Sequence, residues 1–341
     1  MKTKIAINGF GRIGRNVFKV LFERDDVEVV AINDLTDNKT LAHLLKYDTN
    51  YGTYQHPVTS DETGISVKGK KIEILNERDP ANLPWGELAV DVVIESTGFF
   101  VKPEDARKHV EAGAKKVIIS APAKGDNADD AHTMVLGVND DSLGESGDIL
   151  SNASCTTNCI SPVVSVLHAK FGVEKAMMTT VHSYTADQSL QDGPHKDLRR
   201  ARAAAMNIVP TSSGATLAAA KVIPDLEGVF DGLAIRVPTS VVSLSDLTFI
   251  LKKDVSVDEV NQAFRDACDQ PFYQGILECV EDPVVSSDLK GNSHSAIVDT
   301  ALTQVTGGNM VKVIACDDNE SGYSNRLAEL AADTGKAMHN S

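Results

Sequence analysis

Apolar and polar residues follow two different rhythms in the first 150 positions of the chain. Short runs rich in valine and isoleucine predict β-strands, whereas Ile13, Val17, Val20 and Leu21 recur at helical spacing and predict a helix. Strands are expected at 4–8, 27–32, 90–95 and 116–120, helices at 12–23 and 103–112, and a hairpin at 64–75. This alternation of β and α units is typical of a parallel, doubly wound sheet of the Rossmann type.

The pattern changes after residue 150, where the strand-like runs become longer. These runs predict a mixed or antiparallel sheet, and they lie at 177–181, 233–237 and 243–251. Helical spacing is found at 214–222, 257–269 and 323–339. The fold class is therefore α/β, with a Rossmann-type domain and an α+β domain. We expect the first domain at 1–150, completed by a C-terminal helical segment at 316–341, and the second at 151–315.

Composition narrows the class of protein. The 341 residues include 33 Lys and Arg against 48 Asp and Glu, which gives a formal net charge of −15. Nucleic acid and anionic membranes both need a basic surface, so neither is an expected partner. No signal peptide and no apolar run long enough to span a membrane is present, and five scattered cysteines favour a reducing compartment. We expect a cytoplasmic protein without a metal site.

A dinucleotide-binding signature follows the first predicted strand. Gly9, Gly11 and Gly14 form a G-x-G-x-x-G turn that leads into a helix, where free N–H groups and the helix dipole favour phosphate. Asp34 lies at the end of the second strand, where a carboxylate accepts hydrogen bonds from the adenosine ribose and repels the extra phosphate of NADP. NAD is therefore the predicted cofactor. A glycine-rich turn beside a surface Asp is the alternative.

A cysteine and a histidine are the candidate catalytic pair. Ser154 is a good N-cap, which places Cys155 in the first turn of a helix, where the dipole is expected to stabilise a thiolate. His182 follows an apolar run at a strand end and suits the role of proton carrier. Spacing alone leaves the alternative that both residues only pack in the core.

A cysteine nucleophile beside a nicotinamide favours aldehyde oxidation. The thiolate adds to the aldehyde, a hydride passes to NAD, and the resulting thioester is open to attack by water or phosphate. Hydroxyls of Ser154, Thr156 and 211–214, the cationic segment 197–202, and Arg236 could bind anions. A solvated or interface face is the alternative for the arginine cluster.

Six segments, in order along essentially the whole chain, resemble the phosphorylating glyceraldehyde-3-phosphate dehydrogenases of the bacterial glycolytic type. They are INGFGRIGR (7–15), ESTGFF (95–100), SNASCTTNC (151–159), HSYTADQ (182–188), DLRRARAAA (197–205) and DNESGYSNR (318–326).

This resemblance implies a role for each matching residue. Cys155 would be the nucleophile, with its backbone N–H on the oxyanion, and His182 the base. The implied NAD contacts are Gly9, Gly11, Arg12, Ile13, Gly14, Asp34, Arg78, Thr97, Ser120, Asn319 and Tyr323. The implied site for the substrate C3 phosphate is Thr185, Arg200 and Arg236, and that for inorganic phosphate is Ser154, Thr156, Ser213 and Gly214.

The implied reaction converts D-glyceraldehyde 3-phosphate, NAD and inorganic phosphate to 1,3-bisphosphoglycerate, in a homotetramer. An erythrose-4-phosphate dehydrogenase, or a non-catalytic NAD-binding or interaction protein on the same fold, is the alternative. The chain departs from the family in three places. Ser213 stands where Thr is usual, Cys316-Asp317 where Trp-Tyr is usual, and Ser240-Val241 where Pro-Asn is common.

Overall fold

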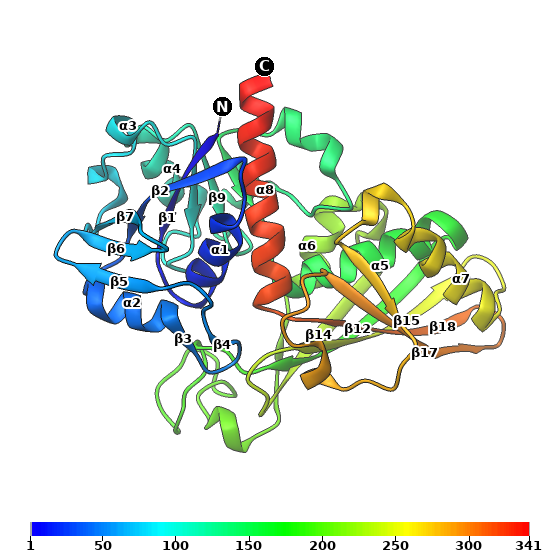
Figure 1. Cartoon of the computed structure of the whole chain (residues 1–341). Helices are drawn as coiled ribbons and strands as arrows, with labels where there is room; N and C mark the ends of the chain where they lie inside the picture. The colour runs from blue at the N-terminus through cyan, green and yellow to red at the C-terminus, as the bar shows by residue number, and fades with distance from the viewer. Residues whose placement is uncertain (1, 341) are drawn as a thin grey trace. The chain divides into compact units, whose positions relative to one another are not determined.

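The computed structural model describes residues 2–340, and contacts divide the chain into two compact units (Figure 1). The first unit contains residues up to Met134, 139–153 and the chain from Ser324 onward, and the second contains 135–138 and 154–323. The C-terminal segment thus joins the first unit at Ser324 rather than at the expected residue 316. The reason is that Cys316 and Asp317 end strand β18 (Met310–Asp317), which belongs to the sheet of the second unit.

The first unit is built on a nine-stranded sheet. Its strand order is β10 (His132–Thr133), β11 (Ile149–Ser151), β9 (Lys116–Ile119), β8 (Val92–Glu95), β1 (Thr3–Asn8), β2 (Val27–Asn33), β7 (Lys70–Leu75), β6 (Gly64–Val67) and β5 (Val58–Asp61). All neighbours from β10 to β7 are parallel, and the last two pairings are antiparallel. The parallel, doubly wound sheet and the 64–75 hairpin predicted from the sequence are confirmed.

Four helices lie between the strands of this unit: α1 (Arg12–Phe22), α2 (Asn38–Lys46), α3 (Trp85–Leu88) and α4 (Pro103–Glu111). Most of α8 (Ser321–Asn340), the last element of the chain, also belongs to this unit from Ser324 onward, and a small ribbon of β3 (Tyr47–Asp48) and β4 (Gly52–Thr53) follows α2. Helix α1 forms because Val17, Phe18 and Leu21 make one apolar stripe, and that stripe is buried. Strands β1 and β8 are buried over nearly their whole length, and the residues 5–7 and 92–94 are accordingly all apolar.

The second unit is built on a seven-stranded mixed sheet. Its strand order is β13 (Val209–Ser212), β14 (Phe230–Val237), β12 (Val173–Ser183), β15 (Ser243–Leu251), β18, β17 (Ala296–Thr306) and β16 (Leu277–Val280). Two pairings, β12 with β14 and β16 with β17, are parallel, and the others are antiparallel. The mixed sheet predicted for the second half of the chain is confirmed.

Helices α5 (Cys155–Phe171), α6 (Ala215–Val222) and α7 (Val257–Cys268) lie along one face of this sheet (Figure 1). Helix α5 is buried almost all round, as its apolar sequence requires. Strand β15 alternates fully buried and partly exposed residues, so one face of the sheet packs against the helices. Among the residues that the structure describes, no helix is both long and apolar enough to cross a membrane.

The glycine turn between β1 and α1 is held by close backbone contacts. Gly9 has a φ of +93°, and a Cβ there would lie 2.6 Å from the backbone nitrogen of Thr97. A Cβ on Gly14 would lie 2.1 Å from the carbonyl oxygen of Gly9, whereas a Cβ on Gly11 would point into open space. Gly9 and Gly14 therefore serve the fold, and Gly11 leaves room for a ligand.

We predict that Gly14→Ala and Gly11→Ala differ sharply in stability. The Gly14→Ala methyl group must displace backbone, which we expect to lower the free energy of unfolding by about 2 kcal/mol or more. Gly11→Ala places a methyl group in open space and should cost less than about 1 kcal/mol. Urea denaturation of the two variants measures the difference, and equal losses would contradict the packing role of Gly14.

Candidate active site

The first unit contains a cavity of about 530 Å³ at the carboxyl ends of its central strands. This volume suits a cofactor, and the ends of parallel strands are where such sheets bind ligands. The cavity is lined by Asn8, Gly9, Gly11, Asn33, Asp34, Leu35, Glu77, Arg78, Ser96, Thr97, Phe99 and Phe100. Five residues with a predicted NAD role, Gly9, Gly11, Asp34, Arg78 and Thr97, are thus brought together.

Asp34 follows the last residue of β2, and its carboxylate ties the glycine turn to the strand. One oxygen accepts a hydrogen bond from the backbone N–H of Phe10 at 2.7 Å, and the other accepts from the N–H of Thr36 at 2.9 Å. The carboxylate is therefore fixed beside the turn and faces the cavity. This position suits a carboxylate that accepts hydrogen bonds from a ribose.

Four other predicted NAD contacts of the first unit lie outside the lining of this cavity: Arg12, Ile13, Gly14 and Ser120. The Arg12 guanidinium donates to Asp48 at 2.6 Å and lies over the ring of Tyr51. This ion pair lowers the pKa of Asp48, although burial of that carboxyl opposes the shift. Arg12 therefore has an internal partner that a pyrophosphate would have to replace or share.

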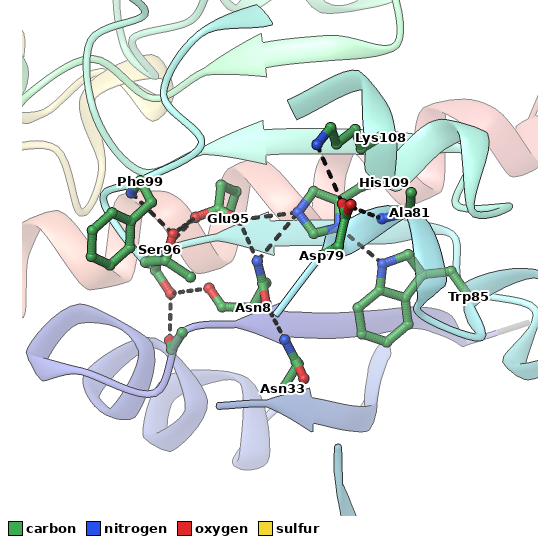
Figure 2. A network of polar contacts seen from close by, with 12 residues as sticks. Asn8, Asn33, Asp79, Ala81, Trp85, Glu95, Ser96, Phe99, Lys108 and His109 are labelled. Atoms are coloured by element: carbon green, nitrogen blue, oxygen red, sulfur yellow. Dashed lines mark hydrogen bonds and ion pairs between the residues drawn. The ribbon is translucent and has the colours of Figure 1, made fainter. Parts of the chain in front are cut away.

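A buried carboxyl group, that of Glu95, holds two residues that line the cavity, Asn8 and Thr97, in a network of hydrogen bonds (Figure 2). The Oε1 atom of Glu95 accepts from both the N–H and the hydroxyl of Thr97, and its Oε2 atom accepts from the Asn8 amide at 2.6 Å. The His109 ring lies 3.0 Å from the same Oε2 atom. Both Glu95 and His109 are excluded from solvent. Charge burial is tolerated here because four donors converge on one carboxylate.

The tautomer of His109 follows from its second neighbour. The indole N–H of Trp85 lies 3.0 Å from His109 Nδ1 (Figure 2), and an indole can only donate. Nδ1 must therefore be the acceptor, so the ring proton is on Nε2 and is donated to Glu95. This chain of contacts connects the core at Trp85 to the cavity residue Thr97 through fixed hydrogen bonds.

The second unit brings Cys155 and His182 together. Cys155 is the first residue of α5, whose N-cap Ser154 accepts a hydrogen bond from the N–H of Thr157. His182 lies near the end of β12, and its Nε2 atom is 3.4 Å from Cys155 Sγ. His182 Nδ1 lies 2.7 Å from the carbonyl oxygen of Ser183, which can only accept. Arg236 Nη1 also lies 3.1 Å from Nδ1, but its hydrogens have acceptors in the Ser183 carbonyl and the Thr185 hydroxyl. The shorter contact with the carbonyl therefore places the proton on Nδ1, and the Nε2 lone pair faces the thiol.

The protonation states of this pair differ from the sequence expectation of a thiolate. Burial raises the pKa of the Cys155 thiol to about 12, the Asp317 carboxylate adds to this, and Arg236 opposes it. Burial also lowers the pKa of His182 to about 4, assisted by the charge of Arg236. Burial outweighs the helix dipole, so the pair without ligands is a neutral thiol beside a neutral imidazole.

Arg236 lies beside this pair because β14 runs parallel to β12 and pairs it with His182. Its guanidinium donates to the Ser183 carbonyl and to the Thr185 hydroxyl, both at 3.1 Å. Its Nε is buried and has no hydrogen-bond partner in the described part of the chain. Thr185 and Arg236 are thus brought together as predicted for an anion site, with one donor still unused.

Asp187 is a functional candidate that the sequence analysis missed. Its carboxylate accepts from the Thr185 hydroxyl and from Arg200, the latter at 2.7 Å. It therefore occupies the donors that are predicted to bind the substrate phosphate. The sequence offered one signal for this residue. Asp187 lies between Thr185 and Arg200, which are both predicted to bind the substrate phosphate.

The second predicted anion site combines two helix N-termini. Ser154 and Thr156 begin α5, and the Ser213 hydroxyl accepts from the N–H of Ala215 at the start of α6, where Gly214 is the N-cap. The hydroxyl of Thr157 lies 3.5 Å from the carbonyl oxygen of Ala215, which holds the two ends near each other. Free N–H groups and helix dipoles at such ends favour phosphate.

Asn319 has one end of its amide fixed. Its carbonyl oxygen accepts from the Ser183 hydroxyl at 3.0 Å and from the N–H of Val242 at 2.8 Å. Val242 has a φ of +74°, which is strained for a β-branched residue, and this conformation directs its N–H at Asn319. The amide NH₂ is therefore the end of the side chain that can donate to a ligand. Tyr323 is buried within the first turn of α8.

Asp317 is a buried carboxyl that interacts electrostatically with Cys155. Neither of its oxygens has a hydrogen-bonded N–H or O–H donor in the described part of the chain. Burial and the neighbouring Asp318 raise its pKa to about 8, and the weakly donating Cys159 thiol opposes them. An aromatic residue is usual here in the family that the sequence resembles, so this titrating group is a feature of the present chain.

A dinucleotide-type cavity and a cysteine–histidine contact with an arginine beside it are the features of a nicotinamide-dependent oxidoreductase. Comparisons with known proteins narrow this class. Residues 3–103 match the family described as glyceraldehyde 3-phosphate dehydrogenase, NAD binding domain, and residues 154–319 match the C-terminal domain of the same enzyme family. The chain belongs to the glyceraldehyde-3-phosphate dehydrogenase family.

The sequences of individual relatives match this chain over almost their whole length. Proteins named glyceraldehyde-3-phosphate dehydrogenase are 56% identical over 332 residues in Priestia megaterium, 54% over 333 residues in Geobacillus stearothermophilus and 52% over 340 residues in Streptomyces coelicolor. These matches cover 97–99% of this chain and 98–100% of each relative. The family and the NAD cofactor predicted from the sequence are confirmed.

We predict that Asp317→Asn removes a pH dependence of stability. The pKa of Asp317 is raised on folding, so its protonated form is the one that the fold tolerates. Stability is therefore complete below the unfolded pKa near 4 and is lost as the pH rises through about 8. Urea denaturation between pH 4 and 9 should show a decline on the order of a few kcal/mol in the wild type relative to Asp317→Asn. Parallel curves would contradict the burial of a titrating carboxyl.

Proposed function

We propose that this protein catalyses the oxidative phosphorylation of D-glyceraldehyde 3-phosphate with NAD and inorganic phosphate in glycolysis and gluconeogenesis. The observation that carries the proposal is the contact of Cys155 Sγ with His182 Nε2 at 3.4 Å, with His182 Nδ1 held by the Ser183 carbonyl. This contact pairs a nucleophile with an unprotonated nitrogen. The family matches and relatives support the same reaction.

In the first step, Cys155 attacks the aldehyde while its proton passes to His182 Nε2, which gives a hemithioacetal on Cys155. The backbone N–H of Cys155, at the N-terminus of α5, donates to the developing oxyanion. NAD, when bound, would supply the hydride acceptor, so that a thioester would remain on Cys155. The imidazolium proton stays next to the sulfur, because the Ser183 carbonyl fixes the ring.

Anion binding should strengthen His182 as a base. The positive charge of Arg236 contributes to the low pKa of His182 in the chain without ligands. A substrate phosphate on Arg236 and Thr185 would neutralise part of that charge and raise the pKa of His182. Arg200 completes this site once the phosphate takes the place of Asp187 on its guanidinium. The catalytic base would therefore gain strength when substrate is bound.

The proposed cofactor contacts also suggest a function for each of the two units. The first would be the NAD-binding domain, where Asp34 accepts from the adenosine ribose and open space at Gly11 admits the pyrophosphate. The second would be the catalytic domain, in which the amide NH₂ of Asn319 orients the nicotinamide. Arg12, Ile13, Gly14, Arg78, Thr97, Ser120 and Tyr323 keep the cofactor roles that the family resemblance implies.

Release of the product needs inorganic phosphate as the second nucleophile. Ser154, Thr156, Ser213 and Gly214 would hold it at the joined N-termini of α5 and α6. Ser213 keeps the hydroxyl of the usual Thr, so the site retains its donor. The assay that tests this role compares NADH formation from glyceraldehyde 3-phosphate and erythrose 4-phosphate, with and without phosphate. Phosphate-independent turnover that favours the tetrose would overturn it in favour of the erythrose-4-phosphate enzyme.

The catalytic role of Cys155 predicts a separation of chemistry from binding. Cys155→Ser should reduce NADH formation by at least about a thousandfold, because the hydroxyl is a far weaker nucleophile beside a base with a low pKa. The affinity for NAD, measured by isothermal titration calorimetry, should stay within about threefold of the wild type. Loss of NAD binding together with activity would assign Cys155 a structural role.

Asp34 should determine the choice between NAD and NADP. Asp34→Ala removes both the ribose acceptor and the charge that repels a 2′-phosphate, so the ratio of kcat/KM for NAD over NADP should fall by about tenfold or more. Asp34→Asn is the matched control, because it keeps the size of the side chain and its bond to the N–H of Phe10 while removing the charge. An unchanged ratio in both variants would contradict the ribose role.

Exposed apolar residues support assembly into a homotetramer. In the 184–208 loop, Leu190, Leu198 and Met206 have exposed fractions of 78%, 81% and 82%. Met177 and Leu233 are likewise exposed on β12 and β14. Surfaces of this kind mark contacts with other chains. Light scattering after size exclusion should give four times the 36.5 kDa mass of the chain, and a monomer would overturn the assembly.

The reducing cytoplasm is the location that we propose.

A further inference from the structure

Two thiols outside the proposed active site are in contact. Cys268 is the last residue of α7, and Cys279 lies in the edge strand β16. Their sulfur atoms are 3.5 Å apart, although ten residues separate them in the sequence. Both side chains are partly exposed, whereas Cys159 is buried. The pair therefore combines van der Waals contact between two sulfurs with access from solvent.

The intervening segment is ordered and keeps the two elements together. A short turn at Pro271–Tyr273 follows α7, and the backbone N–H of Ile276 donates to the carbonyl oxygen of Tyr273 at 3.0 Å. The Tyr273 side chain is buried. The sulfur–sulfur contact is thus part of the fold and does not depend on a chance approach of two loop residues.

The environment distinguishes the two sulfurs. A hydrogen bond from the Cys279 thiol lowers the pKa of Cys268, and the same interaction raises the pKa of Cys279. Cys268 is therefore the sulfur that ionises first and acts as the nucleophile. Carboxylates surround the pair, with Asp269 and Glu278 near Cys268 and Glu281 near Cys279, and the cation Arg265 is bound to Glu281. Such surroundings disfavour anionic reagents and admit uncharged ones.

We propose that Cys268 and Cys279 form a dithiol site that reacts with small, uncharged disulfides and closes to an internal disulfide, separately from the catalytic cysteine. The Cys268 thiolate attacks one sulfur of the reagent, the reagent S–S bond breaks, and one reagent thiol leaves. The Cys279 sulfur then attacks Cys268 in the mixed disulfide, loses its proton and releases the second reagent thiol. The protein gains one S–S bond and loses two hydrogen atoms, while the reagent is reduced to two thiols.

The closed form should change the edge of the sheet rather than the chemistry at Cys155. In the part of the chain that the structure describes, strand β16 is paired on one side only, with β17, so a bond from Cys279 to the end of α7 would restrain the free edge. Oxidation at this site is therefore expected to protect β16 from local opening, as measured by amide hydrogen exchange.

Peptide mapping tests the proposal on the intact wild-type protein. The native chain is treated with 2-hydroxyethyl disulfide, quenched in acid, blocked with N-ethylmaleimide and digested with trypsin without reduction. Cleavage after Arg265 and Lys290 places both cysteines in one peptide, 266–290. We expect this peptide to be lighter by two hydrogen atoms and free of maleimide, and to return to the dithiol with dithiothreitol. A doubly maleimide-labelled peptide, or two stable mixed disulfides, would overturn the proposal.

Two comparisons separate a built site from random oxidation. In the native protein the ratio of closed to mixed disulfide should exceed that in urea by at least about tenfold, because the fold holds the sulfurs in contact. Equal ratios would contradict the proposal. Cys279→Ser should stop at a mixed disulfide on Cys268, whereas the control Cys316→Ser should close normally. Cys155 lies in a different tryptic peptide, 125–170, so closure at Cys268 and Cys279 is read independently of the proposed catalysis.

Discussion

The hydrogen bond between His182 Nδ1 and the Ser183 carbonyl is the constraint on which the proposed chemistry of this protein depends. It fixes the tautomer and so directs a lone pair at the thiol of Cys155. Burial keeps both groups neutral, so the fold does not have to bury a charged pair. The proton therefore passes from Cys155 to His182 only when the thiol attacks the substrate. The parallel pairing of β12 and β14 then adds Arg236 beside the imidazole, so the proposed anion site and the proposed base share one electrostatic environment.

Local donors, and not the overall charge, decide how anions bind. The chain carries a formal charge of −15, yet its proposed ligands are all anions. Arginine side chains, hydroxyls and helix N-termini act at contact distance, whereas exposed carboxylates farther than about 8–10 Å away are largely screened at cellular salt. Asp187 illustrates this local control, because its carboxylate accepts hydrogen bonds from Thr185 and Arg200, the same donors that are proposed to bind the substrate phosphate.

Much of the fold was predictable because its signals are local. Periodicity located β1, α1, β15 and α7 to within two residues, and the glycine turn indicated a cavity at the strand ends. The sequence also predicted Cys155 and His182 as a pair, which lie in contact. It did not predict their protonation, since the helix-dipole argument ignores burial, nor the network from Trp85 to Glu95, which depends on contacts between distant segments. The sequence placed the start of the C-terminal segment at 316, whereas β18 runs to Asp317, α8 begins at Ser321 and the compact units change at Ser324, a boundary that depends on tertiary contacts.

The account is tested most directly by the stoichiometry of NADH formation in the absence of phosphate. Rapid mixing of the protein with NAD and D-glyceraldehyde 3-phosphate should release one equivalent of NADH per Cys155 and then stop, because the thioester waits for its second nucleophile. Added phosphate should restart turnover. Steady NADH formation without phosphate would contradict the account, as would the absence of a burst in a protein that binds NAD normally.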